Sequence, residues 1–449
     1  MNREERERRE RQQRMLRREQ GGSLPEGATL GTQSNSPGVR VPKRVRRSTA
    51  DAPKTTPPPQ PAAPRSNLRP VSELIHRRQR RRRIFWTVVV LVAALVFAGF
   101  TGVLGNSLAM LSDVADTVYL SINQAGGGWP VNTGIQEPLQ VEELAGGFVV
   151  MDSKDVAVYS AYGVKVRSIQ PGYARPALAV GNTRFVVYNR GGTELTVGSR
   201  TRDLYNQKLT NAIMLCSIAN NGTLAIVTES ERYTAEVQIY DPSFRDIYSW
   251  YLTQSEGTPV VLQFASDNHR FAAGTIAARD GQLATTLYLM DTATEGVTAT
   301  YAADTGSMVV SLEWISSRKL LAVFDDYLAL IDPSTGAELG RYNFDGAALQ
   351  SVSANGSSVA LLLSVRGGNN LVTLDEGLTP LAIIPAGQAE TVCCTQTEVY
   401  LLSGTVVECY GFDGVQRWQQ TLDARPVTVL DAAQTLVFAG GYARVLTAP

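Results

Sequence analysis

The sequence predicts an all-β protein built as a β-propeller, and three observations carry that prediction. Beyond residue 126, short runs of valine, isoleucine, leucine and tyrosine alternate with turns of glycine, asparagine and aspartate, without a convincing helical segment. These runs recur with a period of about 40 residues. Each period holds about four strands, which is the content of one propeller blade.

The first large apolar residue after the first turn of each repeat marks the period. The markers are Phe148, Phe185, Leu224, Phe271, Leu320, Val359, Val399 and Leu436. Their spacings are 37, 39, 47, 49, 39, 40 and 37 residues, so we expect eight four-stranded blades, with seven as the alternative if a longer unit is misread. The last repeat begins at Val427 and has room for about three strands. We therefore expect the chain around residues 129–134 to supply its outer strand and close the ring.

Two repeat segments carry a resemblance to a known type of propeller. The segment LALIDPSTGAELGRY at 328–342 resembles the repeat of pyrroloquinoline-quinone-type propellers, and VECYGFDGVQRWQQ at 407–420 places Trp418 where such repeats have a docking tryptophan. The propeller region also looks WD40-like. The whole chain resembles an uncharacterised family of membrane-anchored propeller proteins from Gram-positive bacteria, and this resemblance implies no characterised activity.

Residues 84–104 read IFWTVVVLVAALVFAGFTGVL, 21 residues without a charge, and predict one transmembrane helix. A buried globular helix is the alternative. Arginines crowd the upstream side, whereas the first downstream cation is Lys154, so the amino terminus is expected in the cytoplasm and the rest outside. The membrane-proximal basic cluster consists of Arg77, Arg78, Arg80, Arg81, Arg82 and Arg83.

The chain is formally neutral, but its charge is divided. Residues 1–83 carry 22 basic and 8 acidic residues, a balance of +14, and the remainder carries −14. This tail is rich in arginine and proline, so we expect it to be disordered and cytoplasmic. It either contacts a cytoplasmic partner or anionic lipid, or is a solvated tail; its arginines next to the membrane should attract anionic lipid headgroups, and nucleic acid is not the expected partner.

Between the membrane segment and the propeller, residues 105–125 are expected to form a stalk. Leu108, Leu111, Val114, Val118 and Ile122 recur at helical spacing, which indicates a short helix. Glycines at 126–128 end it. The propeller domain is therefore placed at residues 126–449.

The four cysteines, Cys216, Cys393, Cys394 and Cys409, all fall in the part expected to be extracytoplasmic. Cys409 follows the vicinal pair closely, so a disulfide from Cys409 to either Cys393 or Cys394 is one interpretation. Buried free thiols are the other. No zinc-type spacing of cysteine and histidine occurs.

Other candidate residues have simpler explanations in turn chemistry. His269 falls in a turn, where we expect it to be exposed. Asn221 and Asn355 each precede a glycine and match a glycosylation signal, yet Asn-Gly is also the favoured hairpin turn. The adjacent acidic pairs could bind calcium but lack the usual loop. They are Asp325 with Asp326, Asp375 with Glu376, and Glu142 with Glu143. No catalytic set, cofactor or metal site is expected.

These features favour a binding or scaffold module, held outside the membrane, for a protein or an envelope ligand. The first alternative is an enzyme, either a quinoprotein-like dehydrogenase or a glycan-cleaving propeller with two carboxylates. The second is a ligand sensor that relays to a cytoplasmic partner. Because propellers host many functions, the fold alone does not decide among them.

Overall fold

A computed structural model describes residues 113, 115–120, 128–294, 296–356 and 358–449 of the chain. All of these residues belong to one compact unit, His76–Pro449. The expected cytoplasmic tail and the expected transmembrane helix at 84–104 lie outside the described residues. Within the described ranges, no helix is both long and apolar enough to cross a membrane.

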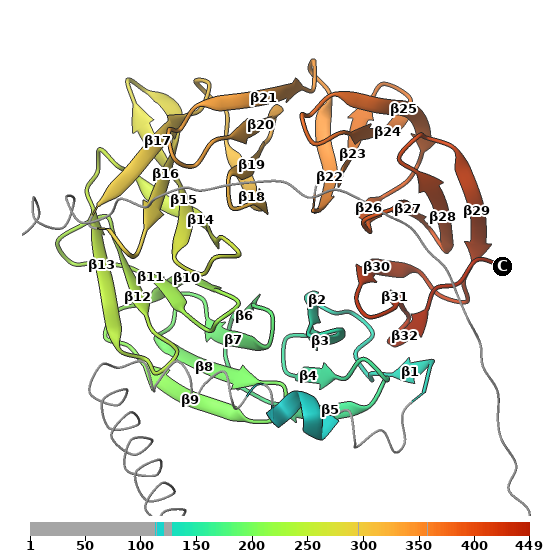
Figure 1. Cartoon of the computed structure of the whole chain (residues 1–449), viewed down its shortest axis with the longest axis horizontal. Helices are drawn as coiled ribbons and strands as arrows, with labels where there is room; N and C mark the ends of the chain where they lie inside the picture. Colours follow the sequence, from blue (N-terminus) through green and yellow to red (C-terminus); the bar gives the residue numbers. More distant parts are fainter. Residues whose placement is uncertain (1–112, 114, 121–127, 295, 357) are drawn as a thin grey trace, which may run out of the picture. The chain divides into compact units, whose positions relative to one another are not determined.

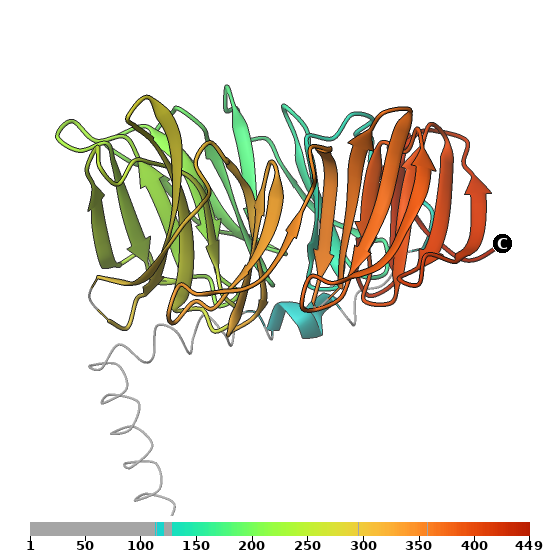
Figure 2. The same ribbon diagram turned by 90° about the horizontal axis from the view of Figure 1, so that it is seen from above.

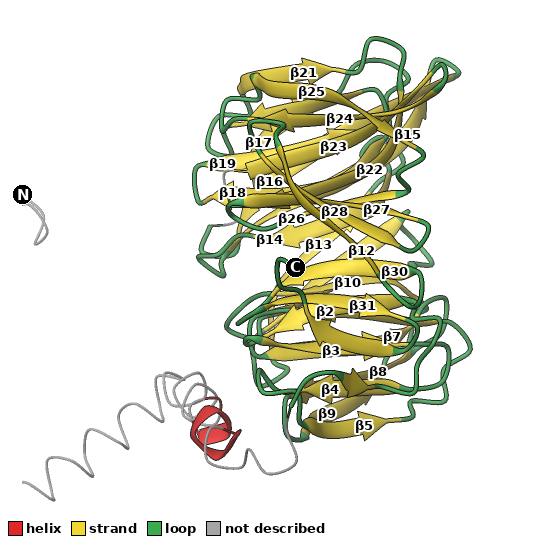
Figure 3. Ribbon diagram, turned by 90° about the vertical axis from the view of Figure 1, so that its right-hand side faces the viewer, coloured by secondary structure: helices red, strands yellow, loops and turns green. Residues whose placement is uncertain are grey.

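The described strands form eight four-stranded antiparallel sheets arranged as blades around a ring, which confirms the all-β propeller with eight rather than seven blades (Figure 1). Seen from the side, strands dominate this part of the chain and are joined by loops and turns (Figure 3). We number the blades 1 to 8 in chain order.

The strands of blades 1 to 4 have the following bounds. Blade 1 holds β2 (Gln140–Leu144), β3 (Gly147–Met151), β4 (Val156–Tyr159) and β5 (Lys165–Ile169). Blade 2 holds β6 (Pro176–Val180), β7 (Arg184–Asn189), β8 (Glu194–Ser199) and β9 (Asp203–Lys208). Blade 3 holds β10 (Ile213–Ile218), β11 (Leu224–Thr228), β12 (Ala235–Tyr240) and β13 (Asp246–Leu252). Blade 4 holds β14 (Thr258–Phe264), β15 (Arg270–Arg279), β16 (Gln282–Asp291) and β17 (Val297–Ala302).

The remaining blades follow the same order. Blade 5 holds β18 (Val309–Ser316), β19 (Lys319–Phe324), β20 (Tyr327–Ile331) and β21 (Glu338–Asn343). Blade 6 holds β22 (Ala348–Asn355), β23 (Ser358–Val365), β24 (Gly368–Leu374) and β25 (Pro380–Gly387). Blade 7 holds β26 (Thr391–Cys394), β27 (Glu398–Ser403), β28 (Val406–Gly411) and β29 (Gln416–Thr421). Blade 8 holds β30 (Pro426–Asp431), β31 (Thr435–Ala439) and β32 (Tyr442–Val445), with β1 (Val131–Asn132) as its fourth strand.

The two ends of the propeller sequence meet in blade 8, as expected. Val131 pairs with Ala443 and Asn132 pairs with Tyr442, so β1 forms the outer strand of the last blade. The Thr133 hydroxyl adds a hydrogen bond to the carbonyl oxygen of Gly441 at 2.7 Å. The ring is therefore closed by hydrogen bonds between its first and last segments.

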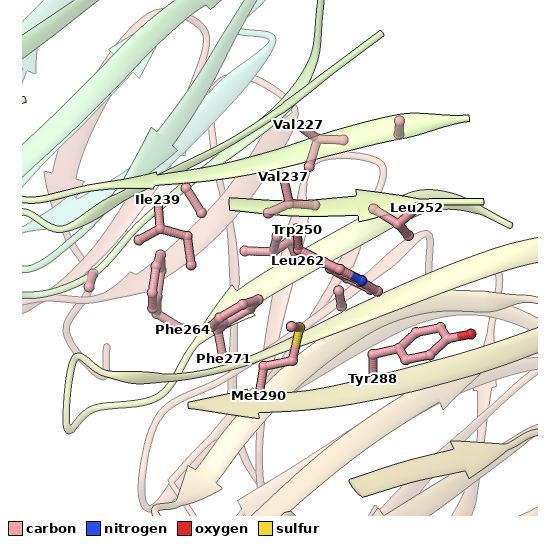
Figure 4. Packing of buried hydrophobic residues seen from close by; sticks show 14 residues of the cluster. Val227, Val237, Ile239, Trp250, Leu252, Leu262, Phe264, Phe271, Tyr288 and Met290 are labelled. Carbon is pink, nitrogen blue, oxygen red and sulfur yellow. The ribbon is translucent and has the colours of Figure 1, made fainter. Parts of the chain in front are cut away.

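Apolar packing between neighbouring blades holds the ring together. Eight clusters of buried apolar residues occur in the described part of the chain, and each cluster joins two adjacent blades. Figure 4 shows the cluster between blades 3 and 4, where Trp250 and Leu252 face Leu262 and Met290. All eight marker residues of the repeat lie in the second strands of the blades and are at most 2% exposed. The period of about 40 residues in the sequence therefore reflects one buried apolar interface for each blade.

The Asn-Gly dipeptides occupy tight turns, as their sequence suggested. Gly222 has φ of +91° and Gly356 has φ of +59°, a region that glycine adopts without strain. The Asn221 side chain accepts a hydrogen bond from the backbone of Thr223 at 2.9 Å, which stabilises its turn. Turn geometry therefore accounts for the asparagine at this position.

A short helix precedes the propeller, within the expected stalk. Residues 113 and 115–120 are helical, and the rest of the expected stalk helix lies outside the described residues. The helix lies at the edge of the ring (Figure 2). It contacts two turns of blade 2, the turn between β6 and β7 and the turn between β8 and β9. We call the edge of the ring that carries these two kinds of turn the helix-side rim, and the opposite edge the far rim.

Candidate functional site

The centre of the ring is encircled by the first strand of every blade (Figure 1). Each of these strands has a hydrogen-bonded neighbour on its outer side and adjacent blades on its two faces. A side chain in the middle of such a strand therefore meets solvent chiefly through the centre of the ring. Exposed residues on these inner strands mark the surface that a ligand at the ring axis would contact.

Five blades carry a β-bulge at the same place, near the start of the inner strand. In blade 5 the pairing skips Val310, between Val309 opposite Phe324 and Ser311 opposite Val323. A bulge leaves one residue unpaired and redirects its side chain. The unpaired residues, which we call the bulge collar, are Met214, Val260, Val310, Gln350 and Val427.

The bulge collar exposes apolar side chains on the far-rim side of the ring. Val310 is 47% exposed, and Val260 and Val427 are each 40% exposed. Met214 is half-buried, and Gln350, the polar member, is exposed. The sequence analysis missed this feature, because a bulge is a matter of pairing register and leaves no clear mark in composition.

Two glutamates lie deeper in the ring, at matching positions of opposite blades. Glu142 in blade 1 pairs with Val149, and Glu313 in blade 5 pairs with Leu321. Val149 and Leu321 each follow directly after the marker residue of their blade. The two glutamates therefore occupy equivalent positions along their inner strands, which we call the same level of the ring. Glu313 lies three residues beyond Val310, about 10 Å along the strand towards the helix-side rim.

The same level is uncharged in the other six blades. Its residues there are Ala179, Ser217, Gln263, Ser353, Cys393 and Val429. The two carboxylates therefore stand out as the charged pair of this layer. We had considered Glu142 only together with its sequence neighbour Glu143, whose carboxylate instead accepts a hydrogen bond from the backbone of Gly146 at 2.5 Å.

The surroundings of the two carboxylates favour their protonated forms. Solvent reaches both side chains, but protein groups surround them, and this partial loss of hydration raises the pKa of Glu142. Burial, and secondarily the charge of Glu142, raises the pKa of Glu313 to about 7. The two carboxylates therefore repel one another across the ring, and a positive charge near either would favour its ionised form.

The cysteines are free buried thiols, and no bridge joins Cys409 to Cys393 or Cys394. Cys393 and Cys409 both pair with Tyr400, one from each side, so β27 separates their strands. Two cysteines two strands apart exceed the Cα separation of about 7 Å that a disulfide tolerates. The interpretation with a disulfide placed Cys409 one strand too close to the pair, and the alternative of buried free thiols is the arrangement seen here. Cys394 instead contacts the Ser353 hydroxyl at 3.2 Å.

The remaining candidates take part in turns. Asp325 and Asp326 accept hydrogen bonds from the Met308 backbone at 2.8 Å and the Ser307 hydroxyl at 2.7 Å. The Asp375 side chain accepts from the backbone of Thr379 at 2.7 Å. The described residues contain no group of three or more metal-ligating side chains placed to hold an ion. The membrane-proximal arginines 77–83 lie outside the described residues.

Trp418 and His269 each have a structural partner. Trp418, in the outer strand β29, packs on Tyr400 with ring centroids 6.0 Å apart. His269 lies in the turn between β14 and β15 as expected, and its side chain is half exposed. Its Nδ1 atom lies 3.0 Å from a carboxylate oxygen of Asp291.

Polar contacts fix the helix at 113–120 to blade 2. The Arg184 Nε atom lies 3.3 Å from the Asp113 carboxylate, and the Arg184 side chain is only 3% exposed. The buried Asp116 carboxylate accepts hydrogen bonds from Ser199 at 2.9 Å and from Thr201 at 2.7 Å. Val118, one of the residues at helical spacing, is 52% exposed, and the hydrogen bonds that join the helix to blade 2 come from polar side chains.

Arg200 completes this contact from the third turn of blade 2. Its Nη2 atom donates to the Asp113 carbonyl oxygen at 3.2 Å and to the Thr117 hydroxyl at 2.5 Å. Burial lowers the pKa of Arg200, and the nearby carboxylates of Asp116 and Asp113 partly offset that effect. A partly desolvated network in which Arg184 pairs with Asp113, and Arg200 and Asp116 bind neutral polar groups, gives the helix one defined position on the blade.

The sequence profile of the family of unknown function DUF5711 matches residues 131–440, from the closing strand β1 to the last blade. The chain belongs to this family. None of the curated proteins matches the chain.

Several solved structures are similar in fold. BamB from Moraxella catarrhalis has 15% identity and a TM-score of 0.48, and the alignment covers 71% of this chain and 96% of BamB. The C-terminal WD40 domain of Sif2 has 12% identity and a TM-score of 0.49, covering 71% of this chain and 99% of that domain. Hsv2 from Kluyveromyces lactis has 9% identity and a TM-score of 0.46, covering 66% and 98%.

Proposed function

We propose that this chain is a single-pass membrane protein whose extracytoplasmic propeller binds a protein or envelope ligand. Residues 84–104 would form the anchor, with the basic tail inside the cell. Only eight residues separate position 104 from Asp113 on the docked helix. Even fully extended they span at most about 30 Å, so the helix-side rim would stay near the bilayer and the far rim would point away.

The observation that carries the binding proposal is the bulge collar. Its apolar side chains are exposed near the far-rim ends of the inner strands, where an arriving partner could cover them. Glu142 and Glu313 lie further along their inner strands than the collar, towards the helix-side rim, and their ionised carboxylates attract positive charge. We therefore propose a ligand segment that packs apolar groups on the collar and directs a basic group towards the two carboxylates.

The anchoring part can be tested by cysteine accessibility in intact cells. The four native cysteines are buried, so they provide a silent background. Ser23→Cys places a thiol in the tail, and Gln282→Cys places one at an exposed position of blade 4. A membrane-impermeant maleimide should label Gln282→Cys before lysis and Ser23→Cys only after lysis. Labelling of both before lysis, or of neither, would overturn the proposed topology.

The ligand part can be tested by photo-crosslinking from the collar. A photoreactive amino acid at Val310 should form a specific covalent adduct in cells, identified by mass spectrometry. Placing it instead at Val365, an exposed apolar residue of the hairpin between β23 and β24 in blade 6, is the matched control. Glu142→Gln with Glu313→Gln should weaken the Val310 adduct about tenfold if a basic group binds the carboxylates. Equal adducts from both positions would count against the collar.

A glycan-cleaving enzyme is the second candidate, and the carboxylate pair is what favours it. A glutamate whose pKa is about 7 can act as a general acid, while a second carboxylate acts as base or nucleophile. Release of reducing ends from purified cell-wall glycan, lost in Glu313→Gln but retained in Glu408→Gln, would establish this function. If no reducing ends are released between pH 5 and 8, the chain is not a glycan-cleaving enzyme of this kind.

A further inference from the structure

A second concave site lies away from the bulge collar, between blades 4 and 5. It is a crevice of about 270 Å³ that opens among turns of the helix-side rim. Blade 4 contributes the turn at His269 and Arg270 and the strand end at Asp291, and blade 5 contributes Trp314 and the turn at Ser334. The volume suits one small ring-shaped molecule rather than a peptide, because drug-sized ligands occupy about 300–1,000 Å³.

The walls of the crevice divide into an apolar part and a polar part. Leu289, Met290 and Pro333 are buried and line it with apolar groups. The Trp314 Nε1 atom donates to the carbonyl oxygen of Gln263 at 3.1 Å, and the half-buried indole packs against the apolar cluster between blades 4 and 5 while also lining the crevice. A ligand with an apolar face would gain most from this wall.

The polar part holds groups of both signs that are already paired. Arg270 Nε donates to Asp267 at 2.6 Å, and His269 Nδ1 lies 3.0 Å from Asp291. Burial alone would raise the pKa of Asp267, but hydrogen bonds from Arg270 and from the His269 backbone outweigh it and lower that pKa. Asp267 neutralises Arg270, and the Asp291 carboxylate is already held by His269 and by the Ala293 backbone, so a hydroxyl group can bind beside either side chain without supplying a charge of its own.

Hydrogen-bonding capacity nevertheless remains at the crevice. The Asp291 Oδ1 atom accepts from His269 and from the Ala293 backbone at 2.8 Å, whereas no described residue donates to Oδ2. No described residue accepts from the Arg270 Nη atoms. A wholly apolar ligand would strip water from these groups without replacing its hydrogen bonds, so the crevice favours a ligand that carries hydroxyl groups.

We propose that this crevice binds one neutral sugar ring. The C–H face of the ring would pack on Trp314, and vicinal hydroxyls would donate to Asp291 and accept from Arg270. The site lies on the helix-side rim, so it is separate from the collar and does not depend on a ligand there. The sugar could belong to a free or wall glycan or to the headgroup of a glycolipid.

Saturation-transfer NMR on the purified full-length chain tests the proposal. The probes are glucose, galactose, mannose and N-acetylglucosamine, with glucosamine and glucuronate as charged comparators. Phosphatidylcholine vesicles with and without a neutral diglucosyl glycolipid form the second arm. Transfer to a neutral probe supports a free glycan, and binding only to the glycolipid vesicles supports a headgroup. No binding in either arm, or preference for a charged sugar, overturns the proposal.

Variants keep the test specific to the crevice. Trp314→Ala and Asp291→Asn should each weaken binding about tenfold, and the exposed substitution Ser334→Tyr should block the crevice without disturbing the core. Trp418→Ala, on the outer strand of blade 7, is the matched control and should bind normally. Equal loss in Trp418→Ala, or full binding by Ser334→Tyr, would show that the sugar does not occupy this crevice.

Discussion

Replacing Arg184 by methionine should release the helix at 113–120 from blade 2. The Arg184 side chain is 3% exposed and the Asp113 side chain is 14% exposed, so the pair is largely shielded from water. Breaking a buried pair costs about 3–5 kcal/mol when the remaining charge stays buried. Here the helix can leave and return Asp113 to water, so the expected cost is that of a charge-assisted hydrogen bond, about 1.5–3 kcal/mol.

This loss corresponds to a rise of roughly 10- to 150-fold in the undocked population. Hydrogen exchange of the backbone amides at 115–120 should accelerate by that factor, while amides of the inner strands exchange as before. Arg202→Met is the matched control, since Arg202 is exposed in the turn of blade 2 next to Arg200. The reasoning fails if exchange at 115–120 is unchanged in Arg184→Met, or if the whole propeller is destabilised in parallel.

Four further outcomes are expected. Phe148→Ala should reduce the free energy of unfolding by about 3–5 kcal/mol in urea denaturation, because this fully buried ring joins blades 8 and 1; a loss below about 1 kcal/mol would contradict the packing. The folded-state pKa of Glu313 is raised, so stability should fall as pH rises from the unfolded value of 4.5 to about 7, and Glu313→Gln should flatten this fall in pH-dependent melting. NMR titration of Glu142→Gln should give a lower pKa for Glu313, and an unchanged pKa would refute their interaction. Native thiols should react with a disulfide reagent only on unfolding, since all four are buried and burial raises their pKa values; rapid reaction of the folded chain would argue otherwise.

Much of the fold could be predicted from the sequence because every blade buries the same kind of side chain at the same position. The marker residues recur since every second strand must bury a large apolar side chain against its neighbours. Closure of the ring by residues 131–132 was also predictable, because the last repeat was one strand short. The membrane segment and the tail remain predictions.

The candidate site was less predictable because it depends on register. Glu142 precedes its marker by six residues and Glu313 precedes its marker by seven, although both occupy the same level of the ring. The difference arises because the pairing of β18 shifts again between Trp314 and Ser316. A fixed offset from the repeat would therefore have aligned only one of the two glutamates. The bulge collar was hidden for the same reason.

The helix contact and the crevice depend on long-range partners. Arg184 and Asp113 are 71 residues apart, and the sequence around either residue does not predict that they form an ion pair. His269 looked like an isolated turn residue because Asp291 lies 22 positions away. Distances of this kind follow from the stacking of blades rather than from local propensity.

Closure of the ring by β1 has a consequence for synthesis of the chain. Asn132 emerges from the ribosome 310 residues before its partner Tyr442. At about 5–20 residues per second, that interval is roughly 15–60 s. During this time β1 and the face of blade 1 that will cover blade 8 wait without their partners. Until then the propeller is an open ring whose first segment exposes unpaired backbone groups and apolar surface, and pairing of β1 with β32 closes it.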